Sequence, residues 1–503
     1  MTEKNWEKMD EKEFERQLAA ELPELPPDDI SHEVTPWRRT VNRILIGIGL
    51  NVITLNFWGL NDFLPAIGMI LCLLGFRALR RESGWFRAGL VITAAKTAFC
   101  LSTLVINMTV YREMLEEEEL FYELSLLQAA LLFALLICLW GGFRRIQRRA
   151  QTGSGHAVGA LCLWYAGLWL LAVWETESMW VGIAMIVLFL LIIRSLSRTS
   201  HEMEEAGYVV EPAPVRVADR TLAGTLTVLV ILGMVIACLF FSRYPMEWEL
   251  AGENTAQTEE IREELTDMGF PEMVLKDLTQ EDLLACQGAT QVLTGEESYR
   301  YFSGEDDETA EDENQETEDS VEEDLTDGEA AETGYELTLT AVAVQLADEN
   351  DSWKIFLHFA WEGNPGFIGT ESLQVYGSWN NRYFWGWNED FTGQVLCEKD
   401  GETYRSAYHN LGLKTAAEST WGIWLGAAFS FPQDCEQARG YVSYTTYSYE
   451  EETSLDSWLY YTHQESRLQY PALTAMERHY SGAESGLGDA FETLYTQFYF
   501  EVE

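Results

Sequence analysis

Residues 221–242 read TLAGTLTVLVILGMVIACLFFS, an apolar run without a single charged side chain. A helix that crosses a bilayer needs about 20 such residues. The composition changes after this run: residues 1–242 carry 21 basic and 26 acidic side chains, whereas residues 243–503 carry 12 and 55. So strong an asymmetry predicts a membrane region followed by a separate, strongly acidic domain.

Six more apolar runs precede this one, and each predicts a membrane-spanning helix. We expect the six helices to fill residues 41–194 as three hairpins, followed by a cytoplasmic loop at 195–220 and the seventh helix at 221–242. Asn61, Asp62 and Pro65 are turn formers, so they predict a tight turn between the first two helices. The six runs are 42–59, 63–79, 86–108, 123–142, 157–174 and 178–194.

Arginines mark alternate connections between these runs, as the positive-inside rule requires of cytoplasmic segments. The acidic connections, such as Glu116–Glu119, fall on the other side. The pattern predicts a multi-pass plasma-membrane protein with a cytoplasmic N-terminus, no signal peptide and an extracellular C-terminal domain. The arginines are Arg38, Arg39, Arg43, Arg77, Arg80, Arg81, Arg144, Arg145, Arg148, Arg149, Arg194, Arg198, Arg216 and Arg220.

Lys96 lies near the middle of the third run, about 15 Å from its start at 1.5 Å per residue. A charge at that depth is costly and is often functional, so Lys96 is a candidate ion or proton site, or one half of a switchable charge pair. The alternative is a lysine that faces other helices and is satisfied by Asn51, Asn56, Gln128 or a backbone carbonyl.

The N-terminal tail, residues 1–40, contains a predicted amphipathic helix at 4–22. Phe14, Leu18 and Leu22 recur every four residues and form a short apolar stripe. The stripe fits either a cytoplasmic partner protein or the membrane surface. No histidine–cysteine cluster of the kind that binds zinc accompanies it.

Two segments follow the seventh run. Residues 243–303 are predicted to form a small extracellular helical unit, because Gly269, Pro271 and Thr279 fit helix-terminus positions. Residues 304–334 are predicted to be an acidic disordered linker, since 16 of the 28 residues at 305–332 are acidic and none is basic. A calcium site is the alternative, but no calcium-loop motif is present there.

Residues 335–503 have the pattern of short strands separated by turns, which predicts an antiparallel all-β sandwich-like domain. Trp353, Ile355, Leu357, Phe359 and Trp361 alternate along the chain, so they are expected on one buried face. The fold class expected for the whole chain is therefore a membrane all-α region of about seven helices, with an extracellular helical unit and β domain.

The segment GSWNNRYFWGWNED, residues 377–390, is the candidate ligand site. Aromatic rings interleaved with amides and carboxylates are typical of sugar-binding surfaces. The alternative is that Trp353 and Trp361 fill the core, whereas the other tryptophans, including those of this segment, brace loops. The residues proposed for ligand binding are Trp379, Trp385, Trp387, Asn388 and Asp390.

The remaining patterns carry no catalytic or cofactor signal. The histidines lack metal-ligand spacing, no nucleophile motif occurs, and so no enzyme activity, metal or cofactor is predicted. Among the outer cysteines, Cys397 and Cys435 form the expected disulfide. The large negative charge of residues 243–503 excludes nucleic acid as a partner there.

The chain resembles a family of uncharacterised multi-pass membrane proteins of clostridial bacteria. The resemblance lies in LPPDDISHEVTPWRRTVNRILIGIGLNVITLNF (25–57), LPAIGMILCLLGFRALRRESGWFRAG (64–89), GFPEMVLKDLTQEDLLAC (269–286), NPGFIGTESLQV (364–375) and DSWLYYTHQESRLQYPALTAMER (456–478). Members are often encoded near extracytoplasmic-function sigma factors, so the resemblance implies a transmembrane regulator.

Three functions remain open from the sequence. The leading hypothesis is a sensor whose tail binds a sigma factor or another cytoplasmic regulator. The alternative is a membrane-anchored protein that binds a cell-wall glycan or another envelope component. A transporter built around Lys96 is the third. In each case the lipid bilayer is a partner.

Overall fold

The computed structural model divides into two compact units, one helical and one mainly β. The helical unit comprises most of the chain up to residue 231, and the C-terminal unit comprises residues 232–503 together with residues 105–118. The structure describes residues 37–52, 59–116, 119–150, 156–174, 178–205, 210, 216–252, 256–302, 334–348, 352–380, 385–388, 390–415, 422–449, 454–481 and 490–501.

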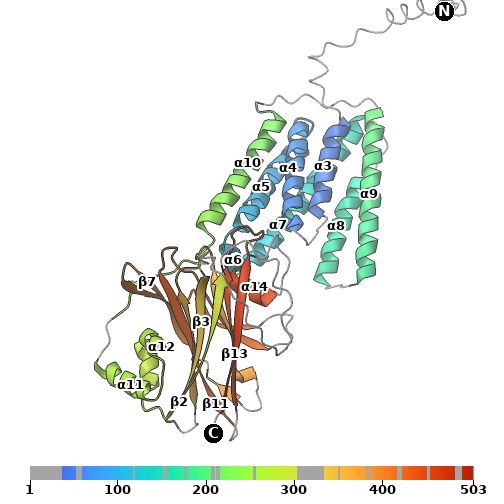
Figure 1. Ribbon diagram of the computed structural model, residues 1–503. Helices are drawn as coiled ribbons and strands as arrows, with labels where there is room; N and C mark the ends of the chain where they lie inside the picture. Colours follow the sequence, from blue (N-terminus) through green and yellow to red (C-terminus); the bar gives the residue numbers. More distant parts are fainter. Residues whose placement is uncertain are drawn as a thin grey trace, which may run out of the picture. The chain divides into compact units, whose positions relative to one another are not determined.

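The helical unit is a bundle of antiparallel helices (Figure 1). Five helices in the described part of the chain are long and apolar enough to cross a membrane, namely α4, α5, α7, α9 and α10, and α8 is a shorter apolar helix. The bundle helices are α3 (Trp37–Val52), α4 (Leu60–Leu79), α5 (Gly84–Ile106), α7 (Glu119–Ala150), α8 (Ala157–Val173), α9 (Met179–Glu205) and α10 (Asp219–Phe240).

These helices correspond to the seven predicted runs, but several boundaries differ. Asn61, Asp62 and Pro65 do not form the turn between the first two helices, because α4 already begins at Leu60. Pro65 lies inside α4, in its second turn, where its missing N–H removes one backbone hydrogen bond of the helix. Helix α9 continues to Glu205, so the predicted loop at 195–220 begins about three turns later than expected.

Glycines allow α3 and α4 to pack closely. A Cβ atom on Gly47 would lie 2.4 Å from the backbone oxygen of Gly68, and one on Gly75 would lie 2.4 Å from a side-chain carbon of Ile44. Such contacts between small residues are how helices associate in a bilayer, where the hydrophobic effect does not hold them together.

The arginine-rich ends of three helices meet at Asp219, the first residue of α10. Its carboxylate lies 2.9 Å from Arg43 of α3 and 3.7 Å from Arg77 of α4. Arg77 also donates a hydrogen bond to the backbone oxygen of Val217. The sequence assigned these three arginine-rich segments to one side of a membrane, and the structure brings them to one end of the bundle.

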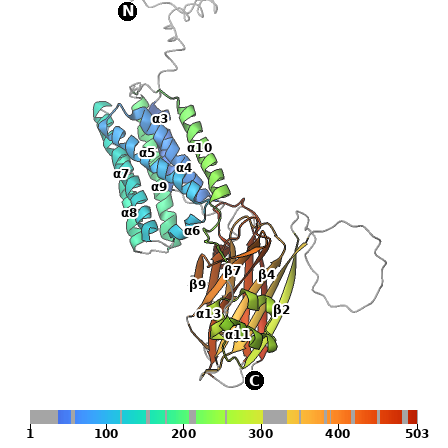
Figure 2. The same cartoon turned by 90° about the vertical axis from the view of Figure 1, so that its left-hand side faces the viewer.

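The C-terminal unit is built around two antiparallel sheets (Figures 1 and 2). The larger sheet has the order β1-β8-β7-β11-β4-β3-β2, with β6 paired to β11, and the smaller has the order β13-β12-β5-β10-β9. The strands are β1 (Glu249–Leu250), β2 (Gln291–Phe302), β3 (Gly334–Gln345), β4 (Trp353–Glu362), β5 (Glu371–Tyr376), β6 (Trp385–Trp387), β7 (Thr392–Lys399), β8 (Glu402–Ser406), β9 (Asn410–Thr415), β10 (Ile423–Phe429), β11 (Gln437–Ser448), β12 (Ser454–Gln464) and β13 (Phe491–Glu501).

The two sheets enclose one hydrophobic core. The five residues predicted to share a buried face of β4 all belong to it, so that prediction is confirmed. Phe359 of β4 stacks on Phe429 of β10 with ring centroids 5.5 Å apart, and it contacts Tyr461 of β12 at 4.9 Å. These contacts join the larger sheet to the smaller one.

Strand β2 departs from the predicted domain boundaries. Residues 243–303 were expected to be helical, but Gln291–Phe302 pairs along its whole length with β3. Gly295, Glu296 and Glu297 interrupt the alternation of apolar residues. The sequence pattern therefore did not predict this strand. The predicted acidic linker at 304–334 lies outside the described residues, except for Gly334.

Helices α11 (Ala256–Asp267), α12 (Glu272–Asp277) and α13 (Gln280–Ala285) confirm the rest of that helical prediction. They cover the outer face of the larger sheet (Figure 2). Ile261 and Phe270 pack there against Phe356 of β4 and Tyr441 of β11. Both of these aromatic residues are therefore buried, although they point away from the core between the sheets.

Two buried aspartates fix the helices to the sheet. Asp282 lies 3.1 Å from the ammonium of Lys354 and accepts hydrogen bonds from Tyr441 and Thr392. Asp277 lies 2.9 Å from a ring nitrogen of His358 and 2.9 Å from Arg439. Buried charges are tolerated only when they are paired and hydrogen-bonded, so these contacts define where the helices sit. The aspartates, Lys354 and His358 are all at most 4% exposed.

Residues 105–116, which begin with the last two residues of α5, are an integral part of the C-terminal unit. Helix α6 (Tyr111–Glu116) contributes Arg112, which pairs with Glu477 at 2.5 Å, and Glu113, which accepts a 2.5 Å hydrogen bond from Tyr244. The backbone N–H of Ala472 donates to the oxygen of Asn107 at 2.8 Å. The connection after α5 therefore folds together with the β domain.

Replacing Asp282 by asparagine should loosen the helical cover. Asp282→Asn leaves the Lys354 ammonium buried without its counter-charge, so we expect residues 256–286 to open more easily by roughly 3–5 kcal/mol. Pulsed hydrogen exchange on the full-length protein at about pH 7 measures this opening. The control is Lys276→Ala, whose exposed pair with Glu272 should contribute less than about 1 kcal/mol. Equal effects of both variants would contradict the account.

The same pair predicts a dependence on pH. Burial acts to raise the pKa of Asp282, but the charge of Lys354 and three hydroxyl donors outweigh burial and hold the pKa below its ordinary value of 3.8. A depressed pKa in the folded state stabilises above the ordinary value, and this stability is lost as the pH falls through the folded-state pKa. The difference between the unchanged protein and Asp282→Asn in the free energy of opening residues 256–286 should therefore shrink on acidification below about pH 4.

Candidate functional site

The outer face of the smaller sheet carries a continuous row of aromatic side chains, which we call the aromatic face. Alternate positions of a strand point to the same side of a sheet, so Trp458 and Tyr460 of β12 project outward together, as do Tyr495 and Tyr499 of β13. The aromatic face consists of Tyr376, Trp424, Trp458, Tyr460, Tyr495 and Tyr499.

Five of the six rings of this face contact one another across four strands, and Tyr499 lies farther along β13. Tyr495 is stacked on Tyr460 at 5.3 Å between centroids and on Trp458 at 6.3 Å. Tyr460 in turn meets the edge of Trp424 at 5.3 Å, and Trp424 contacts Tyr376 at 5.0 Å. Ring-on-ring packing at these separations is favourable, and it fixes the orientation of the exposed rings.

The exposure of this face distinguishes it from the outer face of the larger sheet. Tyr495 is 55% exposed and Tyr499 is 60% exposed, whereas Phe356 and Tyr441 of the larger sheet are completely covered by α11–α13. Helix α14 (Ala475–Ser481) covers only one part of the smaller sheet, where His479 packs against Trp424 at 4.7 Å. Tyr495 and Tyr499 are thus the exposed rings of this face, and exposed aromatic surface is typical of binding sites.

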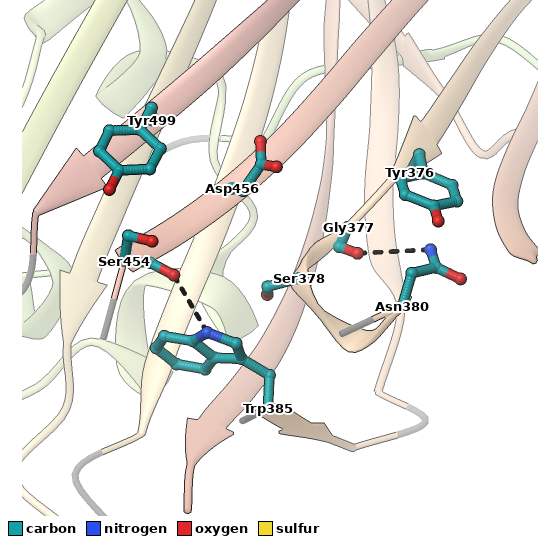
Figure 3. A pocket seen from close by; sticks show the side chains of 8 residues that line it. All are labelled: Tyr376, Gly377, Ser378, Asn380, Trp385, Ser454, Asp456 and Tyr499. Carbon is teal, nitrogen blue, oxygen red and sulfur yellow. Dashed lines mark hydrogen bonds between the residues drawn. The ribbon is translucent and has the colours of Figure 1, made fainter. Parts of the chain in front are cut away.

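A pocket of about 320 Å³ opens at one end of the aromatic face, and we call it the Asp456 pocket. Figure 3 shows the carboxylate of Asp456 between the rings of Tyr499 and Tyr376 in this view, with Trp385 on the opposite side. Asp456 lies directly across from Tyr499 in the pairing of β12 with β13. The lining residues are Tyr376, Gly377, Ser378, Asn380, Trp385, Ser454, Asp456 and Tyr499.

Asp456 retains hydrogen-bonding capacity in this pocket. One carboxylate oxygen, Oδ1, accepts a 2.9 Å hydrogen bond from the side-chain amide of Gln497. The other, Oδ2, accepts none within the described part of the chain. Burial, followed by the charge of Asp456, raises the pKa of Tyr376, so its hydroxyl stays protonated and available as a donor. Burial lowers the pKa of His479 to about 4, so this ring is neutral near pH 7.

The far wall of the pocket is fixed by the start of β10. Asn380, in the 3₁₀ turn η2 (Ser378–Asn380), donates to the oxygen of Ile423 and accepts from its N–H, both at 3.1 Å. The indole N–H of Trp379 donates to the same oxygen at 3.0 Å. A side chain on Gly377 would place its Cβ 2.2 Å from the Trp379 ring, so only glycine fits there.

The predicted ligand residues divide into three groups. Trp379 and Trp385 are 2% and 3% exposed and belong to the core, so they form walls and do not present a free ring face. Trp387 is half-buried and lines a second pocket of about 380 Å³ with Tyr447 and Tyr449. Trp385 lines both pockets.

Asn388 and Asp390 are exposed, yet neither lines either pocket. Asp390 accepts hydrogen bonds from the backbone N–H of Thr445 at 3.2 Å and from its hydroxyl at 2.7 Å. The backbone N–H of Asn388 donates to the oxygen of the same residue at 3.0 Å. These contacts attach Asn388 and Asp390 to β11, so we assign Asp390 a role in shaping the fold.

The other predicted residues lie apart from this site. In the helical unit, Lys96 is 5% exposed and donates 2.7 Å and 3.3 Å hydrogen bonds to the side-chain and backbone oxygens of Gln128 on α7. Gln128 is one of the partners that the sequence offered, and the contact accounts for Lys96 as a link between α5 and α7. Phe14, Leu18 and Leu22 lie outside the described residues.

Cys397 and Cys435 are both buried free thiols in this structure. They are nevertheless neighbours, since a hydrogen bond with Cys397, together with burial, raises the pKa of Cys435. The predicted disulfide is therefore not formed here, although the side chains that it would join lie side by side. Cys397 comes from β7, and Cys435 directly precedes β11, its partner strand.

The aromatic face itself was missed in the sequence. The spacing of Trp458 with Tyr460, and of Tyr495 with Tyr499, is the alternation that places side chains on one face of a strand. This signal was present, but nothing local to either segment shows that β5, β12 and β13 lie next to one another.

No family model matches the chain, and no curated protein does. Among solved structures, parts of the chain are similar to surface-protein domains. One is the collagen-binding subdomain of the Enterococcus faecalis surface protein ACE, at 11% identity and a TM-score of 0.19, covering 31% of this chain and 92% of that one. Another is the keratin-10 (KRT10)-binding region domain of the pneumococcal serine-rich repeat protein PsrP, at 12% identity and a TM-score of 0.18, covering 40% and 99%.

A third similar structure is the collagen adhesin CNA from S. aureus, at 5% identity and a TM-score of 0.17, covering 34% of this chain and 66% of that one. Likeness at this level does not extend to what a protein binds. Function is therefore inferred from the aromatic face and the Asp456 pocket.

Proposed function

We propose that this chain is a membrane-anchored envelope protein whose C-terminal unit binds a glycan on the aromatic face. The observation that carries the proposal is the row of aromatic rings on β13, β12, β10 and β5, of which Tyr495 and Tyr499 are exposed, next to a pocket lined by a carboxylate, an amide and hydroxyls. Sugar rings have apolar C–H faces and polar edges, and this arrangement offers a surface for each.

The geometry favours an extended ligand over a small enclosed one. The aromatic face follows neighbouring strands, which lie about 4.8 Å apart, and so extends over a length that suits several sugar units. The rings are held by each other and by the sheet, so binding costs little side-chain entropy.

We further propose that the C-terminal unit faces the outside of the cell. Arg43 and Arg77 meet Asp219 at the arginine-rich end of the bundle, which the positive-inside rule assigns to the cytoplasm. The connection after α5, predicted to be extracellular, bonds with the β domain through Arg112 and Glu477, which requires both to lie on one side of a membrane. These two observations support one consistent orientation.

The regulatory hypothesis, in which the tail binds a sigma factor, depends on residues 4–22, which lie outside the described residues. It stays a prediction, compatible with a glycan-binding outer domain. The transporter hypothesis depends on Lys96, whose hydrogen bonds to Gln128 give it a structural role instead.

Removing an exposed ring should weaken glycan binding. Because exposed aromatic residues dominate contact surfaces of this kind, we expect Tyr499→Ala and Trp458→Ala each to reduce affinity about fivefold to thirtyfold. The assay is retention of the full-length protein, in nanodiscs, on purified cell-wall polysaccharide. The matched control is Tyr404→Ala, a tyrosine of β8 in the other sheet. The proposal would be contradicted if retention fell only for Tyr404→Ala, or if it fell for none of the three variants.

Orientation can be tested with single cysteines introduced after the eight native ones are replaced by alanine. Tyr449→Cys lies in the β domain and is 60% exposed, whereas Arg198→Cys lies near the arginine-rich end of α9. In intact cells a membrane-impermeant maleimide should label the first and not the second, and permeabilisation should make both reactive. The reverse pattern would place the β domain in the cytoplasm.

A further inference from the structure

We propose that the Asp456 pocket recognises a positively charged amino sugar, namely a glucosamine-type unit whose amine carries no acetyl group. This inference rests on the proposed glycan binding and adds the chemical class of the bound unit. The sugar ring would stack along the aromatic face, and its ammonium group would pair with the Asp456 carboxylate.

The charge inside the pocket supports a cationic ligand. Asp456 is the one carboxyl residue among the described lining residues, and no lysine, arginine or histidine is among them. Its Oδ2 oxygen has no hydrogen-bond donor in the described part of the chain. A carboxylate in this state gains a strong, charge-assisted hydrogen bond from an ammonium group.

The net negative charge of residues 243–503 also favours a cationic ligand. Residues 243–503 carry 55 acidic and 12 basic side chains. The resulting negative potential attracts cationic polymers and repels anionic ones, such as phosphate-bearing wall polymers. An uncharged glycan would still donate a hydroxyl hydrogen bond to the carboxylate, but it would lack the attraction between opposite charges.

The aromatic surroundings favour a sugar over a basic peptide. Tyr499 and Tyr376 line the pocket together with Asp456, so a ligand at the carboxylate has aromatic rings among its neighbours. A pyranose carries its amine directly on a ring that stacks on such surfaces, whereas a lysine carries it at the end of a flexible chain whose immobilisation costs entropy. A basic peptide is therefore the alternative that the experiment must separate.

The test compares three soluble probes with the full-length protein in nanodiscs: a glucosamine hexamer, its fully N-acetylated counterpart and a lysine pentamer. Affinities are measured by calorimetry for the protein, for Asp456→Asn and for Tyr499→Ala. We expect the glucosamine hexamer to bind the unchanged protein most tightly. Asp456→Asn should lower the affinity for this hexamer about tenfold or more, and should change the affinity for the N-acetylated hexamer less than about twofold. Added salt should weaken the binding of the glucosamine hexamer more than the binding of the N-acetylated hexamer.

Each other outcome has a distinct meaning. Equal binding of the two hexamers, with both insensitive to Asp456→Asn, would overturn the amino-sugar inference and leave glycan binding intact. A lysine pentamer that binds as tightly as the glucosamine hexamer and loses as much with Asp456→Asn would also overturn it, in favour of a peptide site. If neither hexamer binds, or Tyr499→Ala has no effect on either, the proposed glycan function itself fails. Asp456 is half-buried at the surface, so Asp456→Asn should fold, and unchanged thermal unfolding verifies this.

Discussion

The period of two residues in a β-strand is the constraint on which this C-terminal unit depends. Every strand in a sandwich presents one set of side chains to the shared core and the other set to an outer face. In β4 the odd-numbered residues from Trp353 to Trp361 form the core, which leaves Lys354, Phe356 and His358 on the outside. A sandwich therefore has two outer faces, and what covers each of them determines what the domain can bind.

Helices cover the two outer faces to different extents. The larger sheet is covered by α11–α13, and the contacts of Asp282 with Lys354 and of Asp277 with His358 hold this cover in place. The smaller sheet has a short helix over one part and leaves Tyr495 and Tyr499 open to solvent. Because Phe356 and Tyr441 on the first face are buried, whereas Tyr495 and Tyr499 on the second are exposed, the second face is the one that offers aromatic rings to a ligand.

The sequence was sufficient where the signal is local. Apolar runs located the membrane helices, and alternation placed the five core residues of β4 on one face. It failed where strands far apart in the chain must meet, as for β2 with β3 and for β12 with β5 and β13. Trp379 and Trp385 illustrate the limit, because aromatic residues next to amides serve equally well as pocket walls and as exposed binding surfaces, and only packing decides between them.

The most direct test of the central claim is hydroxyl-radical footprinting of the full-length protein with and without purified cell-wall glycan, since these radicals react readily with exposed aromatic rings. The account predicts protection concentrated at Trp458, Tyr495 and Tyr499, with Tyr404 on the other sheet unchanged. Protection centred on α11–α13, or modification of Tyr495 and Tyr499 that glycan leaves unaltered, would contradict the assignment of the aromatic face as the binding surface.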